Sequence, residues 1–259
     1  MSAPLSATQV DPSLVQSVFR NVDLRMNGGS TVQLAAGAVI GASAGRSIMT
    51  TTAPLVANVT ITGIGGLDTG SEAADTWYYI YLLRNPNDGD LQLLLSASES
   101  SPTLPGAYTQ FRLIGAVYNN SSSDFVEFVQ HGRAVSRTAI TIFSGASLGT
   151  VSPTGSTQLS VATACPHLIA ESVWGYAFGA GVVDTLGSGT RVHAKSTVAA
   201  PSVLGSHLTF VATALGGGTS QAGGMWGPFP LVDDEIRASH GSPTNISHSV
   251  TISGWYLDV

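Results

Sequence analysis

The stretch TWYYIYLLRNPNDGDLQLLL, from Thr76 to Leu95, carries the strongest structural signal in this sequence of 259 residues. Aromatic and aliphatic residues dominate both of its ends, a composition that favours β-strands. The turn Asn87-Asp88-Gly89 lies between them, and these residue types tolerate the positive backbone φ of tight hairpin turns. We therefore predict a β-hairpin whose strands pack in a hydrophobic core.

Short segments with alternating apolar residues flank this hairpin and are separated by Gly, Pro and Asn, as is typical of a β-sandwich or barrel. Pro102 and Pro105 predict an extended connection at residues 100–108. A second hairpin is expected at residues 111–130, with its turn at residues 119–124. The other predicted strands are residues 31–34, 38–40, 47–51, 56–62, 138–143, 158–162, 168–178, 190–198, 207–215 and 249–259.

The strand pattern predicts an all-β chain of two tandem β-sandwich or jelly-roll-like domains with a short N-terminal helix. Aromatic-rich strands give way to a sparser Ser, Thr and Gly pattern near residues 131–137. We therefore divide the chain into an N-terminal segment, residues 1–21, a first β-domain, residues 22–135, and a distal β-domain, residues 136–259. The glycine-rich residues 216–224 are predicted to form a loop.

The helix is predicted at residues 11–20, where Asp11 precedes a proline at the first helical position. Its apolar residues, including Val18 and Phe19, lie on one side. Two interpretations remain open, because such a helix packs on its own domain or anchors the chain to a neighbouring subunit. In the second case, Val18 and Phe19 are the candidate docking residues.

Composition excludes several classes of protein. Only 10% of the residues are charged, with 10 Lys and Arg against 16 Asp and Glu, so there is no basic surface for nucleic acid. The 43% of hydrophobic residues is too high for a disordered chain. The first positive charge is Arg20, which argues against a secretory signal, and the longest apolar run, residues 34–44, is about half a membrane span. We expect a protein without membrane insertion.

No catalytic, cofactor or metal site is predicted, and we expect that the protein is not an enzyme. The pattern Gly-x-Ser-x-Gly occurs at residues 41–45 and 145–149 but lacks the strand-turn-helix context of a nucleophile elbow. The acidic residues 233–235 lack the alternating spacing of a cation loop, and the six histidines form no helical pair. Cys165 is the only cysteine and is expected to be a buried hydrophobe.

Aromatic residues of the distal half are the candidates for partner contact. Alternation places Trp174, Tyr176 and Phe178 on one face of a strand, which we assign to the core. Trp226 and Phe229 follow the glycine-rich segment and precede acidic residues, so they are the candidates for contact with a partner or a glycan.

Five blocks in the first domain go beyond composition and pattern. They are Gly65–Gly70 (GGLDTG), Asp75–Leu82 (DTWYYIYL), Leu95–Ser98 (LSAS), Ser101–Tyr108 (SPTLPGAY) and Arg112–Val117 (RLIGAV). Together they span residues 63–133, about a quarter of the chain. Their sequence and order closely resemble a module of virion proteins from tailed bacteriophages, often described as tail fibre or tail proteins.

This resemblance implies a structural virion protein, most simply a tail fibre or tail-associated component for host recognition. It also implies other virion proteins as partners, a homo-oligomer with a trimer favoured, and assembly into virions in the bacterial cytoplasm. Host cell-surface polysaccharide is the expected external partner. A head fibre or capsid decoration protein is the first alternative, and a polysaccharide-degrading enzyme is an alternative of another class.

Overall fold

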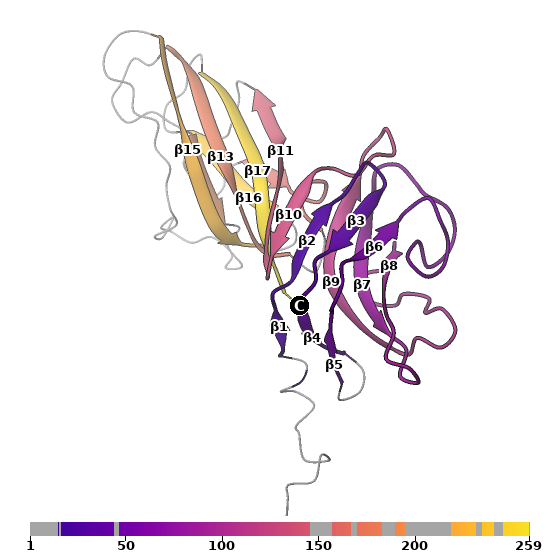
Figure 1. Cartoon of the computed structure of the whole chain (residues 1–259). Helices are drawn as coiled ribbons and strands as arrows, with labels where there is room; N and C mark the ends of the chain where they lie inside the picture. The colour runs from indigo at the N-terminus through magenta and orange to yellow at the C-terminus, as the bar shows by residue number, and fades with distance from the viewer. Residues whose placement is uncertain are drawn as a thin grey trace, which may run out of the picture. The chain divides into compact units, whose positions relative to one another are not determined.

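The computed structural model describes residues 15, 17–43, 47–145, 157–166, 170–182, 190–194, 219–231, 235–240 and 246–258. These residues form an all-β protein built from antiparallel sheets, so the predicted fold class is confirmed at that level (Figure 1). The chain divides into two compact units, Met1–Val135 with Val259 as unit 1 and Ser136–Asp258 as unit 2.

Unit 1 contains three groups of paired strands. The smallest sheet has the order β1-β4-β5, from β1 (Phe19–Arg20), β4 (Val39–Gly41) and β5 (Ile48–Thr50). Four strands run in the order β10-β2-β3-β6, from β2 (Asp23–Met26), β3 (Thr31–Leu34), β6 (Leu55–Asn58) and β10 (Phe128–His131). The third sheet has the order β8-β7-β9, from β7 (Thr76–Arg84), β8 (Leu91–Ser96) and β9 (Gln110–Asn119).

The sheet containing β2 packs face to face on the sheet containing β9, a β-sandwich-like arrangement (Figure 1). The fully buried amide of Gln130 donates to the carbonyl of Ile114 at 2.8 Å, which ties β10 to β9. A Cβ on Gly115 would come within 3.0 Å of the Leu24 side chain. The two layers are therefore in close contact at this glycine, which leaves room for Leu24 and Gln130 between the sheets.

The predicted hairpin at residues 76–95 is confirmed. Strands β7 and β8 pair from Tyr79 opposite Ser96 to Arg84 opposite Leu91. The turn is closed by the amide of Asn85, which donates to the carbonyl of Asp90 at 2.9 Å, and Gly89 adopts a φ of 82°. The interior of β7 is buried on both faces, so this hairpin is the centre of unit 1.

The extended connection after β8 covers the second face of β7. The hydroxyl of Tyr81 donates to the carbonyl of Ser98 at 2.9 Å. Farther along this connection, the hydroxyl of Tyr108 donates to the carboxylate of Asp90, and this hydrogen bond raises the pKa of Tyr108 to about 12. The proline-containing segment is thus attached at both ends to the hairpin that it covers.

The second predicted hairpin is not formed as such. Strand β9 and the turn after it are present, with Ser123 at a φ of 60°, but β9 pairs with β7. The chain then crosses to the other sheet, where β10 pairs with β2. The predicted pairing is limited to the turn, where Asn119 bridges to Phe125 and the amide of Val126 donates to the carbonyl of Tyr118 at 2.9 Å. Burial explains the difference, because Phe125 and Phe128 are covered when the chain bridges the two layers.

The end of the segment predicted as an N-terminal helix, residues 11–20, is a strand in the structure. Phe19 and Arg20 form β1 and pair with Ile40 and Val39, so the end of the predicted segment is a strand. A turn precedes it, in which the amide of Val18 donates to the carbonyl of Val15 at 3.1 Å. Pairing with β4 supplies backbone hydrogen bonds that outweigh the local helix signal. Residues 11–14 and 16 lie outside the described residues.

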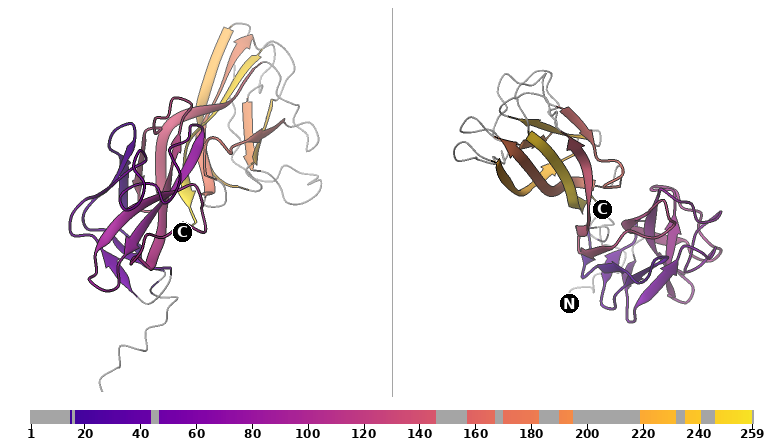
Figure 2. Two further views of the ribbon diagram at one scale, coloured as in Figure 1. Left: turned by 90° about the vertical axis from the view of Figure 1, so that its right-hand side faces the viewer. Right: turned by 90° about the horizontal axis from the view of Figure 1, so that it is seen from above.

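Unit 2 contains two groups of paired strands. The long strands run in the order β15-β13-β17-β11, from β11 (Ala134–Gly145), β13 (Ala170–Val182), β15 (Thr219–Pro230) and β17 (Ile246–Leu257). The short strands have the order β12-β16-β14, from β12 (Thr157–Ser160), β14 (Thr190–Ala194) and β16 (Glu235–His240). Figure 2 shows β13, β15 and β17 lying side by side in orange to yellow colours.

The core of unit 2 forms around Trp255, which is only 1% exposed. The guanidinium carbon of Arg137 lies 5.9 Å from the centre of the Trp255 ring. One nitrogen of the same guanidinium donates to the carbonyl of Ala164 at 2.8 Å. Cys165 is buried close by, as predicted, and donates to the carbonyl of Val161. A charged side chain stacked on an aromatic ring therefore joins β11 to the chain after β12.

The glycine-rich residues 216–224, predicted as a loop, are a strand where the structure describes them. Residues 219–224 belong to β15 and pair with β13, with Gly223 opposite Phe178 and Gly224 opposite Ala177. Residues 216–218 lie outside the described part of the chain. Glycine weakens a strand locally, but a long partner strand supplies the hydrogen bonds that hold this segment extended. The predicted strand at residues 207–215 also lies outside the described residues.

Candidate functional site

The candidate docking residues Val18 and Phe19 lie within the small sheet of unit 1. Phe19 stands opposite Ile40 in the β1-β4 pair. The carbonyl of Val18 accepts a hydrogen bond from the amide of Gly41 at 2.9 Å. Both residues are half-buried, so their backbones belong to unit 1 while part of each residue stays accessible.

Trp226 and Phe229, the candidates for partner contact, both lie on β15. Trp226 stands opposite Gly175 and Phe229 opposite Val173 in the pairing with β13. Their side chains lie outside the described part of the structure. Met225, next to Trp226, is 63% exposed and stands opposite Tyr176.

The structure places two other aromatic residues of β13 on an outward face. Val173, Gly175 and Ala177 are buried, whereas Tyr176 is 47% exposed and Trp174 is half-buried. The assignment of Trp174 and Tyr176 to the core is therefore wrong. Alternation correctly groups the two residues on one face, but the core is filled from the other face and from β17.

Strand β17 adds a third ring to this face. Trp255 points into the core, and its neighbour Tyr256 is 39% exposed. The rings of Trp174 and Tyr256 lie with their centres 4.9 Å apart and their planes at 55°. We call the outward set Trp174, Tyr176, Tyr256 and Met225 the aromatic face. Three adjacent strands, β15, β13 and β17, build it.

Gly175 lies at a bulge in the centre of this face and allows β13 and β17 to approach each other closely. The register of β13 against both neighbours shifts next to Gly175. A Cβ there would come within 1.8 Å of the carbonyl oxygen of Thr251, so the close approach of β17 requires glycine. The hydroxyl of Thr251 donates to the carbonyl of Tyr176 at 3.0 Å and accepts from its amide at 3.3 Å. The backbone that carries Tyr176 is thereby fixed from the neighbouring strand.

Unit 1 contains a polar hollow of about 410 Å³ beside β8. It is lined mainly by hydroxyl side chains and one carboxylate, from Asp68, Thr69, Ser71, Ala73, Thr76, Tyr78, Ser96, Ala97, Ser98, Ser101 and Thr103. Asp68 is its only charged residue. The sequence signal for this hollow is spread over three separate segments, so the pattern of any one segment could not reveal it.

The Asp68 carboxylate uses its acceptor capacity within the protein. One oxygen accepts from the hydroxyl of Ser96 at 2.7 Å and from the amide of Thr103 at 2.9 Å. The other accepts from the amide of Thr69 at 2.7 Å. Because these donors come from β8, from the connection after it and from the loop before β7, Asp68 joins three parts of unit 1. We call Asp68 a structural tie, because its hydrogen bonds link these three segments to one another.

Replacing Asp68 by asparagine is expected to lower the free energy of unfolding by about 2 kcal/mol, because the neutral amide offers one acceptor to donors arranged for a carboxylate. Chemical denaturation of the purified protein measures this loss. Asp75→Asn is the matched control, since Asp75 is exposed and accepts one long hydrogen bond of 3.3 Å from Tyr118. Equal, small losses in both variants would show that Asp68 is not a tie.

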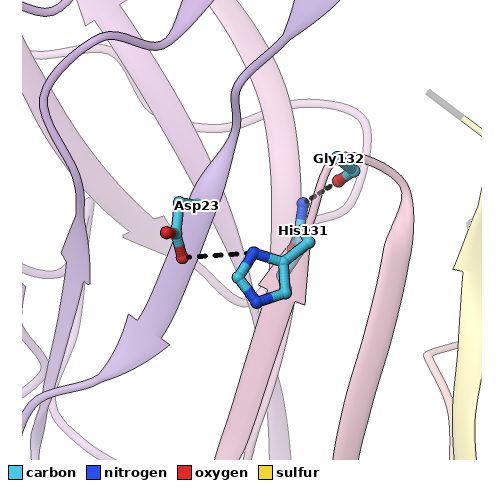
Figure 3. A network of polar contacts seen from close by, with 4 residues as sticks. Asp23, His131 and Gly132 are labelled. Atoms are coloured by element: carbon cyan, nitrogen blue, oxygen red, sulfur yellow. Dashed lines mark hydrogen bonds and ion pairs between the residues drawn. The ribbon is translucent and has the colours of Figure 1, made fainter.

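A polar pair lies on the outer face of unit 1. His131 and Asp23 stand opposite each other in the β10-β2 pair, with Nδ1 3.7 Å from the carboxylate (Figure 3). Their side chains are 73% and 48% exposed. A contact between two side chains this exposed contributes little to the free energy of folding.

The remaining sequence patterns form no site in the described residues. Ser43, in the first Gly-x-Ser-x-Gly pattern, follows the short strand β4, and its amide donates to the carbonyl of Phe111 at 2.8 Å. Residues 146–149 of the second pattern lie outside the described part, as do residues 233 and 234 of the acidic cluster. No group of three or more potential metal ligands occurs among the residues that the structure describes.

Within the described ranges, no helix has the length and apolar character needed to cross a bilayer. Comparison with protein-family models, with curated proteins and with solved structures finds no match.

Proposed function

We propose that this chain is a structural protein of a tailed-bacteriophage virion, a tail fibre or tail-associated component that meets the host cell. In this proposal unit 1 is the rigid module that attaches to the particle, and unit 2 presents a binding surface. The virion is its place of action. The protein performs no catalysis and carries no cofactor.

One observation carries the proposal: the five blocks that resemble the phage module lie together in one body. Leu67, from the first block, bridges to Leu95, from the third. Asp68 then ties the first block to Ser96 and to Thr103 of the fourth. The second and fifth blocks contribute most of the paired strands β7 and β9. Blocks that are scattered in the sequence therefore support one another physically, as expected for a module that is inherited as a unit.

The low charge of the chain supports assembly with copies of itself, most simply as a trimer. The outer face of the sheet β10-β2-β3-β6 includes the row Val129, Arg25, Gln33 and Val56. Val129 and Val56 are 40% and 42% exposed at the two ends of this row, and the proposal places the row at the contact with another subunit. Light scattering of the full chain tests this part, and a monomer would contradict it.

The location on the particle is tested by binding. The labelled full chain is mixed with isolated tails, with empty heads and with host cells. Saturable binding to tails and to cells is the expected result. Binding to heads alone would replace the tail assignment by a head fibre or decoration protein, and binding to neither particle fraction would contradict a virion role.

A further inference from the structure

We infer that the aromatic face of unit 2 is a binding site for a neutral glycan of the bacterial cell envelope. The inference deepens the proposed function and rests on it for the source of the glycan. The binding itself is a property of the purified chain. Its starting point is an outward sheet face on which aromatic rings stand where exposed strands usually carry polar residues.

The rings and hydroxyl groups of this face lie in neighbouring rows. Residues directly opposite in an antiparallel pair point to the same side of the sheet. Tyr176 stands opposite Thr251 on one side and Met225 on the other, and Tyr256 stands opposite Ser172. Rings from β13 and β17 therefore lie beside the hydroxyl side chains of Ser172 and Thr251, and β15 adds the thioether of Met225. A sugar ring has the complementary surface, with C–H groups on its faces and hydroxyls on its edges.

The face is fixed before any ligand arrives. Its side chains stand on long paired strands, and the hydroxyl of Thr251 holds both backbone groups of Tyr176. The contact between Trp174 and Tyr256 restricts both rings. Aromatic side chains also have few rotatable bonds. A ligand that stacks here loses little binding energy to ordering of the protein.

The size of the face fits a small ligand better than a second copy of the chain. Tyr176, Tyr256 and Met225 are each exposed by about half, so together they offer on the order of 300 Å² of surface. A stable protein interface buries about 800 Å² on each partner. A patch of a few hundred square ångströms is the usual size of a functional apolar patch on a monomer.

The charges on and around the aromatic face favour a neutral glycan over an acidic one. The described residues of this face, including Ser172 and Thr251, carry no charged side chain. The charged residues that flank it along the two strands, Glu171 and Asp258, are both acidic and exposed. They repel an acidic polysaccharide, and they do not disturb a neutral one.

The test uses the purified full chain and three soluble tetrasaccharides. Maltotetraose and cellotetraose are the neutral probes, and tetragalacturonate is the acidic one. Saturation-transfer NMR and tryptophan fluorescence report binding. At least one neutral probe is expected to bind with a Kd of about 1 mM or tighter. Tyr176→Ser should weaken this binding about tenfold, whereas Tyr176→Phe, which keeps the ring, should bind like the parent protein.

Several results would overturn the inference. They are binding of neither neutral probe, equal binding of the acidic probe, or equal loss in the Tyr176→Phe and Tyr176→Ser variants. A change in molecular mass in Tyr176→Ser, measured by light scattering, would instead identify the face as a contact between copies. The particle tests are independent of these results. Sugar binding by a chain that is absent from particles would refute the virion proposal and leave the glycan site standing.

Discussion

Replacing Gly66 by alanine is expected to lower the free energy of unfolding of unit 1 by about 3 kcal/mol or more. A Cβ at this position would lie 2.3 Å from the carbonyl oxygen of Ile61 and 2.6 Å from its side chain. The oxygen belongs to the backbone, so no rotamer change relieves the contact. The carbonyl of Gly66 also accepts a hydrogen bond from the amide of Leu95 at 2.8 Å, and a shift of the loop would break it.

Urea denaturation followed by circular dichroism measures the loss in the Gly66 variant. Gly70→Ala is the matched control in the same loop. Gly70 has a φ of 78°, but a Cβ there would meet nothing within 4 Å, so only the conformational cost of about 1 kcal/mol is expected. A Gly66 variant as stable as the Gly70 variant would show that Gly66 does not approach the backbone of Ile61 as closely as described.

Replacing Trp255 by alanine is expected to cost about 3–5 kcal/mol in unit 2, the usual loss for a fully buried tryptophan. The substitution removes the largest fully buried side chain of the described core. It also leaves the Arg137 guanidinium without the ring that it faces at 5.9 Å. Denaturant unfolding followed by tryptophan fluorescence and circular dichroism gives the measurement.

Tyr256→Ala is the control for Trp255, because the two residues are neighbours whose side chains point to opposite faces of β17. Tyr256 is 39% exposed, and its loss should cost about 1 kcal/mol, mainly its contact with Trp174. If both variants lost the same stability, the assignment of inner and outer faces in unit 2 would be wrong, and the proposed glycan site would lose its basis.

The sequence was sufficient to predict the centre of unit 1 because the local signals there agree with one another. Aromatic and branched residues from Thr76 to Leu83 favour a strand, and the turn residues before Asp90 favour a hairpin. Burial of β7 on both faces then follows from its uninterrupted apolar run. The same agreement is missing at the start of the chain, where the helix signal ends in Phe19 and Arg20 and pairing with β4 decides the structure.

The candidate site was harder to predict because alternation does not say which face of a strand is buried. Trp174 and Tyr176 share a face, and their size suggested the core. The core is filled instead by Val173 and Ala177 together with Trp255 of a strand about 80 residues later. Only the pairing of β13 with β17, a long-range feature, determines that the larger rings of β13 face outward.

The hydrogen bonds of Asp68 in unit 1 also could not be predicted from local sequence patterns. Asp68, Ser96 and Thr103 stand in three separate blocks, and no spacing rule brings a carboxylate to a hydroxyl 28 residues away. The contacts between these segments became visible only in three dimensions. In physical terms, a hydrogen bond depends on positions within about 3 Å, which the local pattern of a chain does not specify.

The measurement that tests the central proposal most directly is protein mass spectrometry of purified tailed particles. The particles are collected by density gradient from a culture that expresses the gene for this chain, and heads and tails are then separated. We expect the chain in the intact particles and in the tail fraction, in a copy number that is a multiple of three. Its absence from particles, when it is abundant in the same lysate, would contradict a virion role.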